Sequence, residues 1–292
     1  MKLTVCVSTY NQSEYILECL KSIDEQECNI NFDIIVGVDH SPDSTLSIVE
    51  SYKKISRHDI IIITSDMNIG ASENYLRIHK VANGDYVCHI DGDDIMLPGK
   101  LQKQVDILNT NNDISAVWHN MILFNDDGVI LDRKYADIWK GIVNLTDFLR
   151  VGFIGAHSSI MYRKSCRKKY DFSYPVPDYA IFLELLSNGN GYVIEESLGK
   201  YRHNVKKGTI NTSLMEFKNI VYKSIIDYDN KYQYNKKDLF CFSLLNLLAD
   251  IKSGRKLSPD LISLFKKNIS FLSLFTLYDS YKKMKKTNVN RR

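Results

Sequence analysis

The chain has 292 residues, enough for one large α/β domain or for one domain with a smaller appendage. Its composition is globular, with 44% hydrophobic and 25% charged residues, and its formal net charge of +3 does not require a nucleic-acid partner. No run in the sequence reaches the roughly 18–20 apolar residues that a membrane-spanning helix needs. The totals therefore argue against a nucleic-acid-binding protein and against a membrane-spanning one.

The cysteines indicate a reducing compartment. Six of them are scattered at positions 6, 19, 28, 88, 166 and 241, with no C-x-x-C pair. This spacing predicts reduced thiols rather than a disulfide framework or a zinc site. The first residues lead directly into a predicted strand, without the pattern of a signal peptide. We therefore expect a cytoplasmic protein.

Residues 1–110 alternate between strand and helix patterns. Strands are predicted over residues 3–7, 32–38 and 60–64, and a fourth begins near residue 86. Apolar residues at helical spacing predict helices that begin after Ser13 as a cap, at Pro42 behind a Ser41 cap, over 71–81, and at Pro98. Such alternation predicts a parallel sheet with right-handed crossovers.

Polar residues follow three of these strands. They are the turn at residues 8–11, Asp39, and the sequence Asp-Gly-Asp-Asp at 91–94. In open α/β sheets, ligands bind beyond the carboxyl ends of the strands, so polar residues at three such ends predict one shared binding site. The three carboxylates at 91–94 repel one another, and a cation such as Mg²⁺ or Mn²⁺ between them relieves that repulsion. The alternative interpretation is a solvated acidic turn after a strand.

Residues 111–205 have a mixed pattern. Strands are predicted over 116–124, 129–131, 158–162, 191–195 and 198–203, and helices over 145–151 and 176–186. Asn144 or Thr146 lies near the start of the first helix, where either side chain can cap it. We expect this half to extend the sheet and to cover the edge at which the first half binds its ligand.

Residues 206–292 are predicted to be helical, over 214–228, 236–251 and 259–277, the last with Ser258 as its N-cap. Apolar residues at 271–277 precede a tail rich in lysine and arginine. An apolar helix with a basic cluster can lie on an anionic membrane surface, which would make the protein peripheral on the inner face of the cytoplasmic membrane. The alternative is a packed helix followed by a solvated tail.

Five stretches match those of a known family in order and in spacing. They are residues 7–11, 34–45, 68–72, 82–86 and 91–94, the last followed by Pro98 and Leu101. Together they resemble family 2 glycosyltransferases of the GT-A fold, over about residues 1–205. The resemblance implies an α/β fold with a mostly parallel, Rossmann-like central sheet flanked by helices. It divides the chain into a nucleotide-binding half (1–110), an acceptor-binding half (111–205) and a helical C-terminal region (206–292).

The resemblance also implies roles for individual residues on the donor side. The positions that contact the donor nucleotide correspond to Ser8, Thr9, Tyr10, Asn11, Asp39, Asp91 and Gly92. Asp39 would receive the base N–H, Asp91 would lie near the ribose, and Asp93 would bind the Mn²⁺ or Mg²⁺ that bridges the two phosphates of the donor. A cation there neutralises the charge that develops on a nucleoside diphosphate leaving group. No role follows for Asp94.

Two further residues correspond to the acceptor side. Asp178 lies at the start of the predicted helix 176–186, where the family carries the carboxylate that deprotonates the acceptor hydroxyl and so gives inversion at the anomeric carbon. The alternative role of Asp178 is that of a helix N-cap or first-turn acid beside Pro177. His157 lies in a segment similar to the acceptor-side segment of the family, although a lone histidine is more often structural or solvated than catalytic.

The chain departs from the family pattern in three places. The first is Val38-Asp39-His40-Ser41, where the family often reads Asp-Asp-Gly-Ser, and this variation leaves Asp39 in place. Glu73-Asn74 stands where Ala-Arg-Asn is usual, so a phosphate-facing arginine is missing unless Arg77 replaces it. The stretch Tyr-Arg-His-Asn at 201–204 resembles the usual Tyr-Arg-x-His, with the histidine one place early. The last two departures put the phosphate contacts of both segments in doubt.

We therefore expect a metal-dependent, inverting glycosyltransferase of the hexosyl- or N-acetylhexosaminyltransferase type. The resemblance favours a UDP-sugar as donor and, as acceptor, a hydroxyl of a glycan or lipid-linked oligosaccharide in the synthesis of a bacterial surface polysaccharide such as O-antigen or capsule. One alternative is a non-catalytic module that binds a nucleotide-sugar or a glycan, which would not need metal carboxylates and an acid at Asp178 together. Another is a sugar nucleotidyltransferase, which would need a glycine-rich loop where residues 8–11 contain no glycine.

Overall fold

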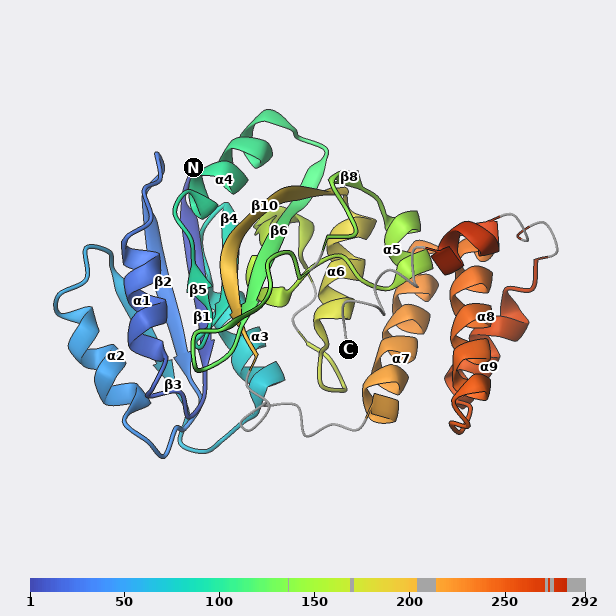
Figure 1. Ribbon diagram of the computed structural model, residues 1–292, viewed down its shortest axis with the longest axis horizontal. Helices are drawn as coiled ribbons and strands as arrows, with labels where there is room; N and C mark the ends of the chain where they lie inside the picture. Colours follow the sequence, from blue (N-terminus) through green and yellow to red (C-terminus); the bar gives the residue numbers. More distant parts are fainter. Residues whose placement is uncertain (136, 169–170, 204–213, 271–272, 274–275, 283–292) are drawn as a thin grey trace.

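Figure 1 shows the computed structural model, in which a central sheet carries helices on both faces and a group of helices lies beyond one end. The structure describes residues 1–135, 137–168, 171–203, 214–270, 273 and 276–282. The mixed α/β architecture, with mostly parallel strands in the centre and a helical C-terminal region, confirms the fold class expected from the sequence.

Among the described residues, the sheet has ten strands in the order β3-β2-β1-β4-β9-β6-β10-β5, with β7 beside β6 and β8 beside β10. The long strands β1 to β4, β6 and β10 run in one direction, and the short strands β5, β7, β8 and β9 run against them. The strands are β1 (Leu3–Thr9), β2 (Phe32–Val38), β3 (Ile60–Thr64), β4 (Tyr86–Asp91), β5 (Ile95–Met96), β6 (Ile114–Phe124), β7 (Ile130–Asp132), β8 (Gly141–Val143), β9 (Met161–Arg163) and β10 (Asn190–Arg202).

The register of the parallel strands brings the predicted polar ends together. Strand β1 lies between β2 and β4, and it pairs Thr9 with Val38 on one side and Ser8 with Asp91 on the other. Because parallel strands place all their carboxyl ends on one edge, Asp39 and the 91–94 loop emerge on either side of the end of β1. The parallel sheet predicted for residues 1–110 is therefore confirmed.

Helices cover both faces of this sheet (Figure 1). The helices of the described residues are α1 (Ile16–Asp24), α2 (Thr45–Lys53), α3 (Ala71–Val81), α4 (Lys100–Thr110), α5 (Leu145–Val151), α6 (Asp178–Ser187), α7 (Leu214–Tyr232), α8 (Lys236–Lys252) and α9 (Pro259–Lys267), with short 3₁₀ turns η1 (His157–Ser159) and η2 (Lys164–Cys166). The last three, α7 to α9, lie beyond one end of the sheet (Figure 1). Successive side chains of a strand point to opposite faces. Val5 and Val7 of β1 accordingly join the core under α1, α2 and α4, while Cys6 joins the core under α3 and α6.

The C-terminal helices pack onto the second half of the chain. Tyr222 of α7 and Phe242 of α8 belong to the same apolar core as Tyr179 of α6. The buried carboxylate of Asp238, at the start of α8, pairs with Arg150 of α5 at 2.7 Å. Residues 214–267 thus share one core with the predicted acceptor-binding half. Within the described ranges, every helix is too short or too polar to cross a bilayer.

Two predicted helix caps in the first half are wrong. Helix α1 begins at Ile16 with Tyr15 in the cap position, because the N–H of Ser13 donates to Asp43 Oδ2 (2.9 Å) and holds the preceding turn against the neighbouring loop. Helix α2 begins at Thr45 rather than at Pro42. The hydroxyl of Ser41, the predicted cap, instead accepts the N–H of Asn11 at 3.0 Å.

Three boundaries in the rest of the chain also differ from the prediction. The predicted strand 158–162 is the turn η1 followed by β9, since the Ser159 side chain and N–H both bond to Ala156 O. The two predicted strands at 191–195 and 198–203 form one strand, β10, with irregular register in between. The predicted helix 259–277 ends at Lys267, where Asn268 Nδ2 donates back to Leu264 O at 2.8 Å. Residues 271, 272, 274 and 275 of that prediction lie outside the described residues.

Candidate active site

The carboxylate loop is held tightly against the end of β1. The N–H of Gly92 donates to Ser8 O at 2.8 Å, and the N–H of Asp94 donates to Asp91 O at 3.0 Å. A Cβ atom at Gly92 would lie 2.8 Å from Thr9 Oγ1 and 2.7 Å from Gln12 Oε1. Only glycine lets the chain pass this close, so Gly92 fixes the position of the acids on both sides of it.

The three acids of the loop have different environments. The side chain of Asp91 is 37% exposed. Its partial burial raises the pKa of the carboxyl, but the hydrogen bond from His89 (3.2 Å) outweighs this effect and holds the pKa below the usual range. Burial, together with the neighbouring Asp91, raises the pKa of Asp93 to about 6. Asp94 is fully buried, and burial followed by the charges of Asp93 and Asp91 raises the pKa of its carboxyl well above the usual range.

The donor atoms of this loop are of the kind that a hard divalent cation takes. The loop carries three carboxylates within four residues, and carboxylate oxygens are what Mg²⁺ and Mn²⁺ prefer. Within the described part of the chain, His89, Asp91 and His157 are a group whose possible ligand atoms lie within 4.8 Å of one another. The raised pKa of Asp93 comes first from burial and then from the neighbouring charge of Asp91. Among the described residues, Asp94 Oδ2 is a buried oxygen without a hydrogen-bond partner. Asp93, less buried than Asp94, is the acid best placed to bind a metal ion.

Arg202, at the end of β10, ties the far half of the sheet to this loop. Its N–H donates to Asp94 Oδ1 (2.8 Å) and its Nε donates to the carbonyl oxygen of Asp93 (3.0 Å). The guanidinium group lies between the rings of Tyr15 and Phe124, 4.4 Å from each centroid. Asp94 therefore serves to anchor β10, a role that the sequence did not suggest.

The residues predicted to hold the nucleoside surround the end of β1. Asn11 has a positive φ of 52°, which turns the chain sharply after Tyr10, whose side chain is 38% exposed. Ser8 Oγ accepts from Asn74 Nδ2 of α3 at 3.1 Å, and Thr9 Oγ1 donates to Gln12 Oε1 at 2.8 Å. The structure brings all four turn residues to the edge that also carries the carboxylate loop.

Asp39 is buried at the same edge, with 1% of its surface exposed. Its Oδ1 accepts from the Ile69 N–H (2.8 Å) and from Ser65 Oγ (3.1 Å), and its Oδ2 accepts from the Gly70 N–H (2.8 Å). A carboxylate has about four acceptor positions, so these bonds leave roughly one, on Oδ2, for a further donor. The predicted contact with a base N–H is therefore restricted to one oxygen.

Asp178 is the first residue of α6, after Pro177 in the cap position. One of its oxygens, Oδ1, accepts the N–H of Tyr179 at 2.8 Å. The N–H of Val176 donates to the hydroxyl of Ser72, in the first turn of α3, at 2.6 Å. Helix α3 begins directly after the segment that binds Asp39, so Asp178 lies toward the same edge of the sheet as the donor-side residues. Its position as a first-turn acid is observed, and its role as a base stays a prediction.

The comparison with protein families decides the identity of the fold. The sequence model described as "Glycosyl transferase family 2" matches residues 4–169, which is more than half of the chain. This protein belongs to glycosyltransferase family 2. Its enzyme class and its GT-A fold, both expected from the sequence, are thereby confirmed. Enzymes of this family commonly use divalent metals.

Some relatives of this glycosyltransferase are named for a specific transfer, and others are named as uncharacterized glycosyltransferases. It is 29% identical over 285 residues to an uncharacterized glycosyltransferase of Haemophilus influenzae, which covers 90% of this chain and 85% of that protein. It is 38% identical over 127 residues to dTDP-rhamnosyl transferase RfbG of Shigella flexneri, which covers 42% of this chain and 43% of that protein. The crystal structure of S. aureus TarS 1-349 in complex with UDP-GlcNAc shares the fold, with a TM-score of 0.71 and 19% identity over 97% of this chain and 88% of that one.

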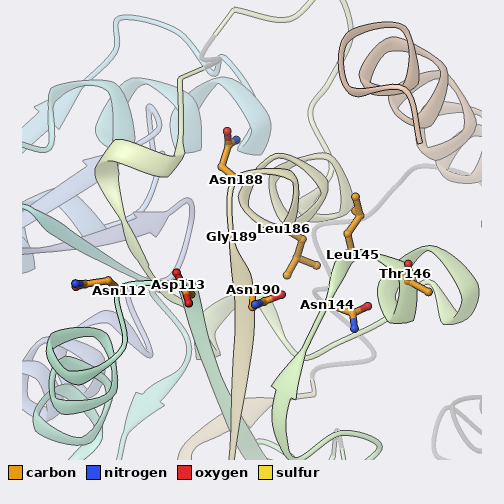
Figure 2. Close-up of a pocket in the computed structure, with 9 residues that line it drawn as sticks. All are labelled: Asn112, Asp113, Asn144, Leu145, Thr146, Leu186, Asn188, Gly189 and Asn190. Carbon is orange, nitrogen blue, oxygen red and sulfur yellow. The ribbon is translucent and has the colours of Figure 1, made fainter. Parts of the chain in front are cut away.

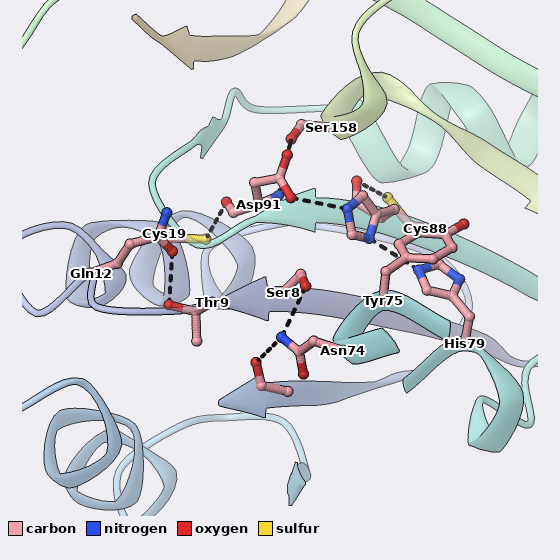
Figure 3. Close-up of polar contacts among 12 residues, drawn as sticks. Ser8, Thr9, Gln12, Cys19, Asn74, Tyr75, His79, Cys88, Asp91 and Ser158 are labelled. Atoms are coloured by element: carbon pink, nitrogen blue, oxygen red, sulfur yellow. Dashed lines mark hydrogen bonds and ion pairs between the residues drawn. The ribbon is translucent and has the colours of Figure 1, made fainter. Parts of the chain in front are cut away.

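Sequence reasoning missed a group of histidines beneath the glycosyltransferase site (Figure 3). His79 of α3 and His89 of β4 are fully buried, with His79 Nε2 3.0 Å from His89 Nδ1. His157, the predicted acceptor-side residue, stacks on His89 with ring centroids 4.2 Å apart, and burial holds its pKa well below the usual range. His79 and His89 stand at positions where the pattern of the predicted helix and strand calls for an apolar residue. A polar residue at such a position is the sequence feature that could have revealed them.

Arg77 does not replace the missing phosphate-facing arginine. Its guanidinium group donates to the carbonyl oxygens of Val38 (3.1 Å) and Thr64 (2.9 Å), and to Asn74 Oδ1 (2.7 Å). These bonds tie the ends of β2 and β3 to α3. The guanidinium group of Arg77 therefore stabilises the carboxyl-end edge of the sheet through these bonds and is not directed toward a bound ligand.

A separate concave region of about 450 Å³ opens at the other edge of the sheet, where β6 and β10 begin (Figure 2). Four of its side chains are asparagines, and its lining consists of Asn112, Asp113, Asn144, Leu145, Thr146, Leu186, Asn188, Gly189 and Asn190. Strand β6 has 11 residues, so at ~3.3 Å per residue this pocket lies roughly 30 Å or more from the carboxyl-end edge. It is distinct from the site of the clustered acids.

Proposed function

We propose that this glycosyltransferase moves one sugar from a nucleotide-sugar to a hydroxyl of a glycan, with a divalent metal ion and with inversion at the anomeric carbon. The group of Asp91, Asp93 and Asp94 carries the proposal, because it is costly to assemble unless a cation and a diphosphate bind there. Held by Asp93, a metal ion would neutralise the charge that develops on the departing nucleoside diphosphate.

The chain's own residues would divide the rest of the reaction. Asp178 would take the proton of the acceptor hydroxyl as its oxygen forms a bond to the anomeric carbon. The bond from that carbon to the diphosphate oxygen breaks on the opposite side of the sugar, which inverts the configuration. The N–H of Tyr179, bonded to Asp178 Oδ1, would hold the carboxylate in place for this transfer.

A pyrimidine nucleoside diphosphate is the proposed leaving group. Uracil and thymine each offer one ring N–H, which suits the single acceptor position left on Asp39. TarS, which shares the fold, was crystallised in complex with UDP-GlcNAc, and the name of RfbG specifies a dTDP-linked donor. Both nucleotides have this N–H, so we propose a UDP-sugar and treat a dTDP-sugar as the alternative within the same chemistry.

A thermal-shift screen with and without Mn²⁺ tests the donor. A nucleotide-sugar at about one hundred times its Kd stabilises a protein by about 2.7 kcal/mol, enough to raise the melting temperature by several degrees. We expect one UDP-sugar to do so only with the metal. Release of nucleoside diphosphate on adding a glycan acceptor, with product of inverted anomeric configuration by NMR, then establishes transfer. Binding without turnover on any acceptor would favour the non-catalytic module, and formation of nucleotide-sugar from a sugar phosphate would favour the nucleotidyltransferase.

The proposed acceptor is a glycan or lipid-linked oligosaccharide of a bacterial surface polysaccharide, reached from the cytoplasmic side of the membrane. The family resemblance and the basic C-terminal tail motivate this part of the proposal, although residues 283–292 lie outside the described residues. Co-sedimentation with vesicles that contain anionic lipid should be salt-sensitive and should be lost when residues 283–292 are removed. Equal sedimentation of both forms would rule out a membrane role for the tail.

A further inference from the structure

A chain of buried polar groups runs under the candidate site and ends on Asp91. Arg167 Nη1 lies 3.4 Å from the hydroxyl of Tyr162, which lies 2.7 Å from His79 Nδ1. His79 Nε2 lies 3.0 Å from His89 Nδ1, and His89 Nε2 lies 3.2 Å from Asp91 Oδ1. Figure 3 labels two of its members, Asp91 and His79, together with Tyr75, which stacks on His79. We call these five groups, from Arg167 to Asp91, the buried polar chain.

The two ends of the buried polar chain fix the direction of its end bonds, and the Tyr162 hydroxyl, which accepts from Arg167, has His79 Nδ1 as the acceptor for its own proton. A guanidinium group can only donate, and an ionised carboxylate can only accept. Donation therefore runs from Arg167 to Tyr162, from the Tyr162 hydroxyl to His79 Nδ1, and onward through each ring. In this arrangement each ring accepts at Nδ1 and donates from Nε2. Burial, followed by the nearby His89 and Arg167, lowers the pKa of His79 well below its usual range, which agrees with a neutral ring.

Ring stacking fixes the orientation of the two imidazoles. Tyr75 stacks on His79 with centroids 3.9 Å apart, and His157 lies over His89 at 4.2 Å. The second oxygen of Asp91, Oδ2, accepts from Ser158 Oγ at 3.3 Å. Since both oxygens of Asp91 have a donor from the protein and the donors are themselves fixed, the carboxylate has one preferred orientation.

The buried polar chain joins elements from both halves of the protein. His79 comes from α3 and His89 from β4, in the first half, whereas Tyr162 of β9 and Arg167, just after η2, come from the second. Tyr162, His79 and His89 are each fully buried, and Arg167 is 3% exposed. In a water-free environment such hydrogen bonds are stronger than at a surface, and their loss leaves buried groups unpaired.

We propose that His89 and His79 are positioning residues, which hold the Asp91 carboxylate in the orientation that binds the nucleoside part of the donor. The inference rests on the proposed function, because it assumes that Asp91 contacts a nucleotide. It assigns His157 a structural task, that of covering the ring of His89. It also makes the binding of the donor depend on Arg167, in the segment that follows β9.

Two measurements on the whole protein test the proposal. In ¹⁵N-histidine NMR spectra of the ligand-free protein at neutral pH, His79 and His89 should both be neutral Nε2–H tautomers. A charged ring or an Nδ1–H tautomer at either position overturns the direction of the chain. This readout is independent of any enzymatic activity, so it separates the arrangement of the chain from the identity of the ligand.

The second measurement is the affinity for UDP with Mn²⁺, by calorimetry. His89→Leu removes the donor to Asp91, and we expect binding to weaken about tenfold or more. His89→Gln keeps an N–H donor and should stay within about threefold of the wild type. In the transfer assay, His89→Leu should raise KM for the nucleotide-sugar with little change in kcat. The matched control is His119→Leu, which removes another fully buried histidine, on β6, that the chain does not include.

A milder pair of variants covers the case in which His89→Leu does not fold. Tyr162→Phe removes one hydroxyl and leaves His79 Nδ1 without its donor, so UDP binding should weaken about threefold. Tyr86→Phe removes a buried hydroxyl, bonded to Asn109 Oδ1, from the other end of β4 and should leave the affinity unchanged. Equal UDP affinity of wild type, His89→Leu and Tyr162→Phe overturns the positioning role and leaves the proposed function standing. A wild type that binds neither UDP nor dTDP overturns both.

Discussion

The two edges of the central sheet carry polar residues of different kinds. At the carboxyl ends, acids are crowded together, and burial beside Asp91 raises the pKa of Asp93 to about 6. At the amino ends, four asparagines and one acid are among the residues that line the pocket, and Asn188 Nδ2 already donates to the carbonyl oxygens of Glu184 (2.8 Å) and Cys166 (3.2 Å). Crowded, buried carboxylates lower the stability of a protein and are found mostly at functional sites. Amide side chains whose hydrogen bonds are made within the protein contribute to the fold instead. The difference supports the proposal that the reaction takes place at the carboxyl edge.

The largest test of this contrast is Asp93→Asn. The amide keeps the shape of the side chain but removes the charge that would hold the metal ion. Since a metal supplies several kcal/mol of transition-state stabilisation, we expect kcat to fall about ten-thousandfold. Release of nucleoside diphosphate, measured over a range of Mn²⁺ concentrations, checks this. Asp171→Asn, at a carboxylate that is 94% exposed, is the matched control and should be fully active. Metal-dependent turnover by Asp93→Asn at the wild-type rate would contradict the assignment.

Asp178→Asn should have the next largest effect. If the carboxylate takes the proton of the acceptor, its loss lowers kcat about a hundred- to a thousandfold, while KM for the nucleotide-sugar stays within about twofold. The asparagine oxygen can still accept the Tyr179 N–H, so the start of α6 should remain intact and the melting temperature nearly unchanged. Steady-state kinetics with the donor and acceptor varied in turn measure both constants. Wild-type kcat in this variant would leave Asp178 only its role as a first-turn acid.

Gly92→Ala should have an intermediate effect, through position rather than charge. The added methyl group would lie 2.8 Å from Thr9 Oγ1, so the loop must move away from β1. We expect a loss of about 1–3 kcal/mol in the free energy of unfolding and nucleotide affinity about tenfold weaker. Chemical denaturation and calorimetry measure the two. Gly84→Ala is equally crowded, 2.6 Å from Thr4 N, at the opposite end of β4 and should cost stability without weakening the affinity of the folded protein. The same affinity loss in both variants would mean that the effect is not local to the loop.

The sequence predicted the carboxyl edge well because its signals are local. Each polar residue there follows an apolar strand directly, so a parallel sheet alone brings Asp39 and Asp91 to either side of β1. The helix caps were harder, since Ser13 and Ser41 bond to partners about 30 residues away rather than to their own helices. Such tertiary contacts override local capping preferences and leave no mark on the nearby sequence.

The buried polar chain could not be predicted for a related reason. His79 and His89 are ten residues apart on a helix and a strand, and their partner Tyr162 lies 83 positions beyond His79. No spacing rule connects these positions, because the contact depends on how α3 packs on β4 and β9. Likewise, the anchoring role of Asp94 requires the end of β10 to reach the loop that follows β4, which is far away in sequence. Local patterns therefore revealed the acids, and packing between distant elements determined what holds them.

The smallest effect is expected at the amino edge, where Asp113→Asn changes the one acid among the residues that line the pocket. Its side chain is exposed, and the hydrogen bond that the segment makes to β10, from the Asn190 N–H at 2.8 Å, goes to its backbone oxygen and survives the substitution. We expect kcat/KM for donor and acceptor within about twofold of the wild type and a free energy of unfolding within about 0.5 kcal/mol. Kinetics with short and long glycan acceptors provide the measurement. Loss of activity confined to long acceptors would mean that the amino edge also contacts substrate. The carboxyl edge would then carry out the reaction and the amino edge would bind the acceptor, so both edges would serve function.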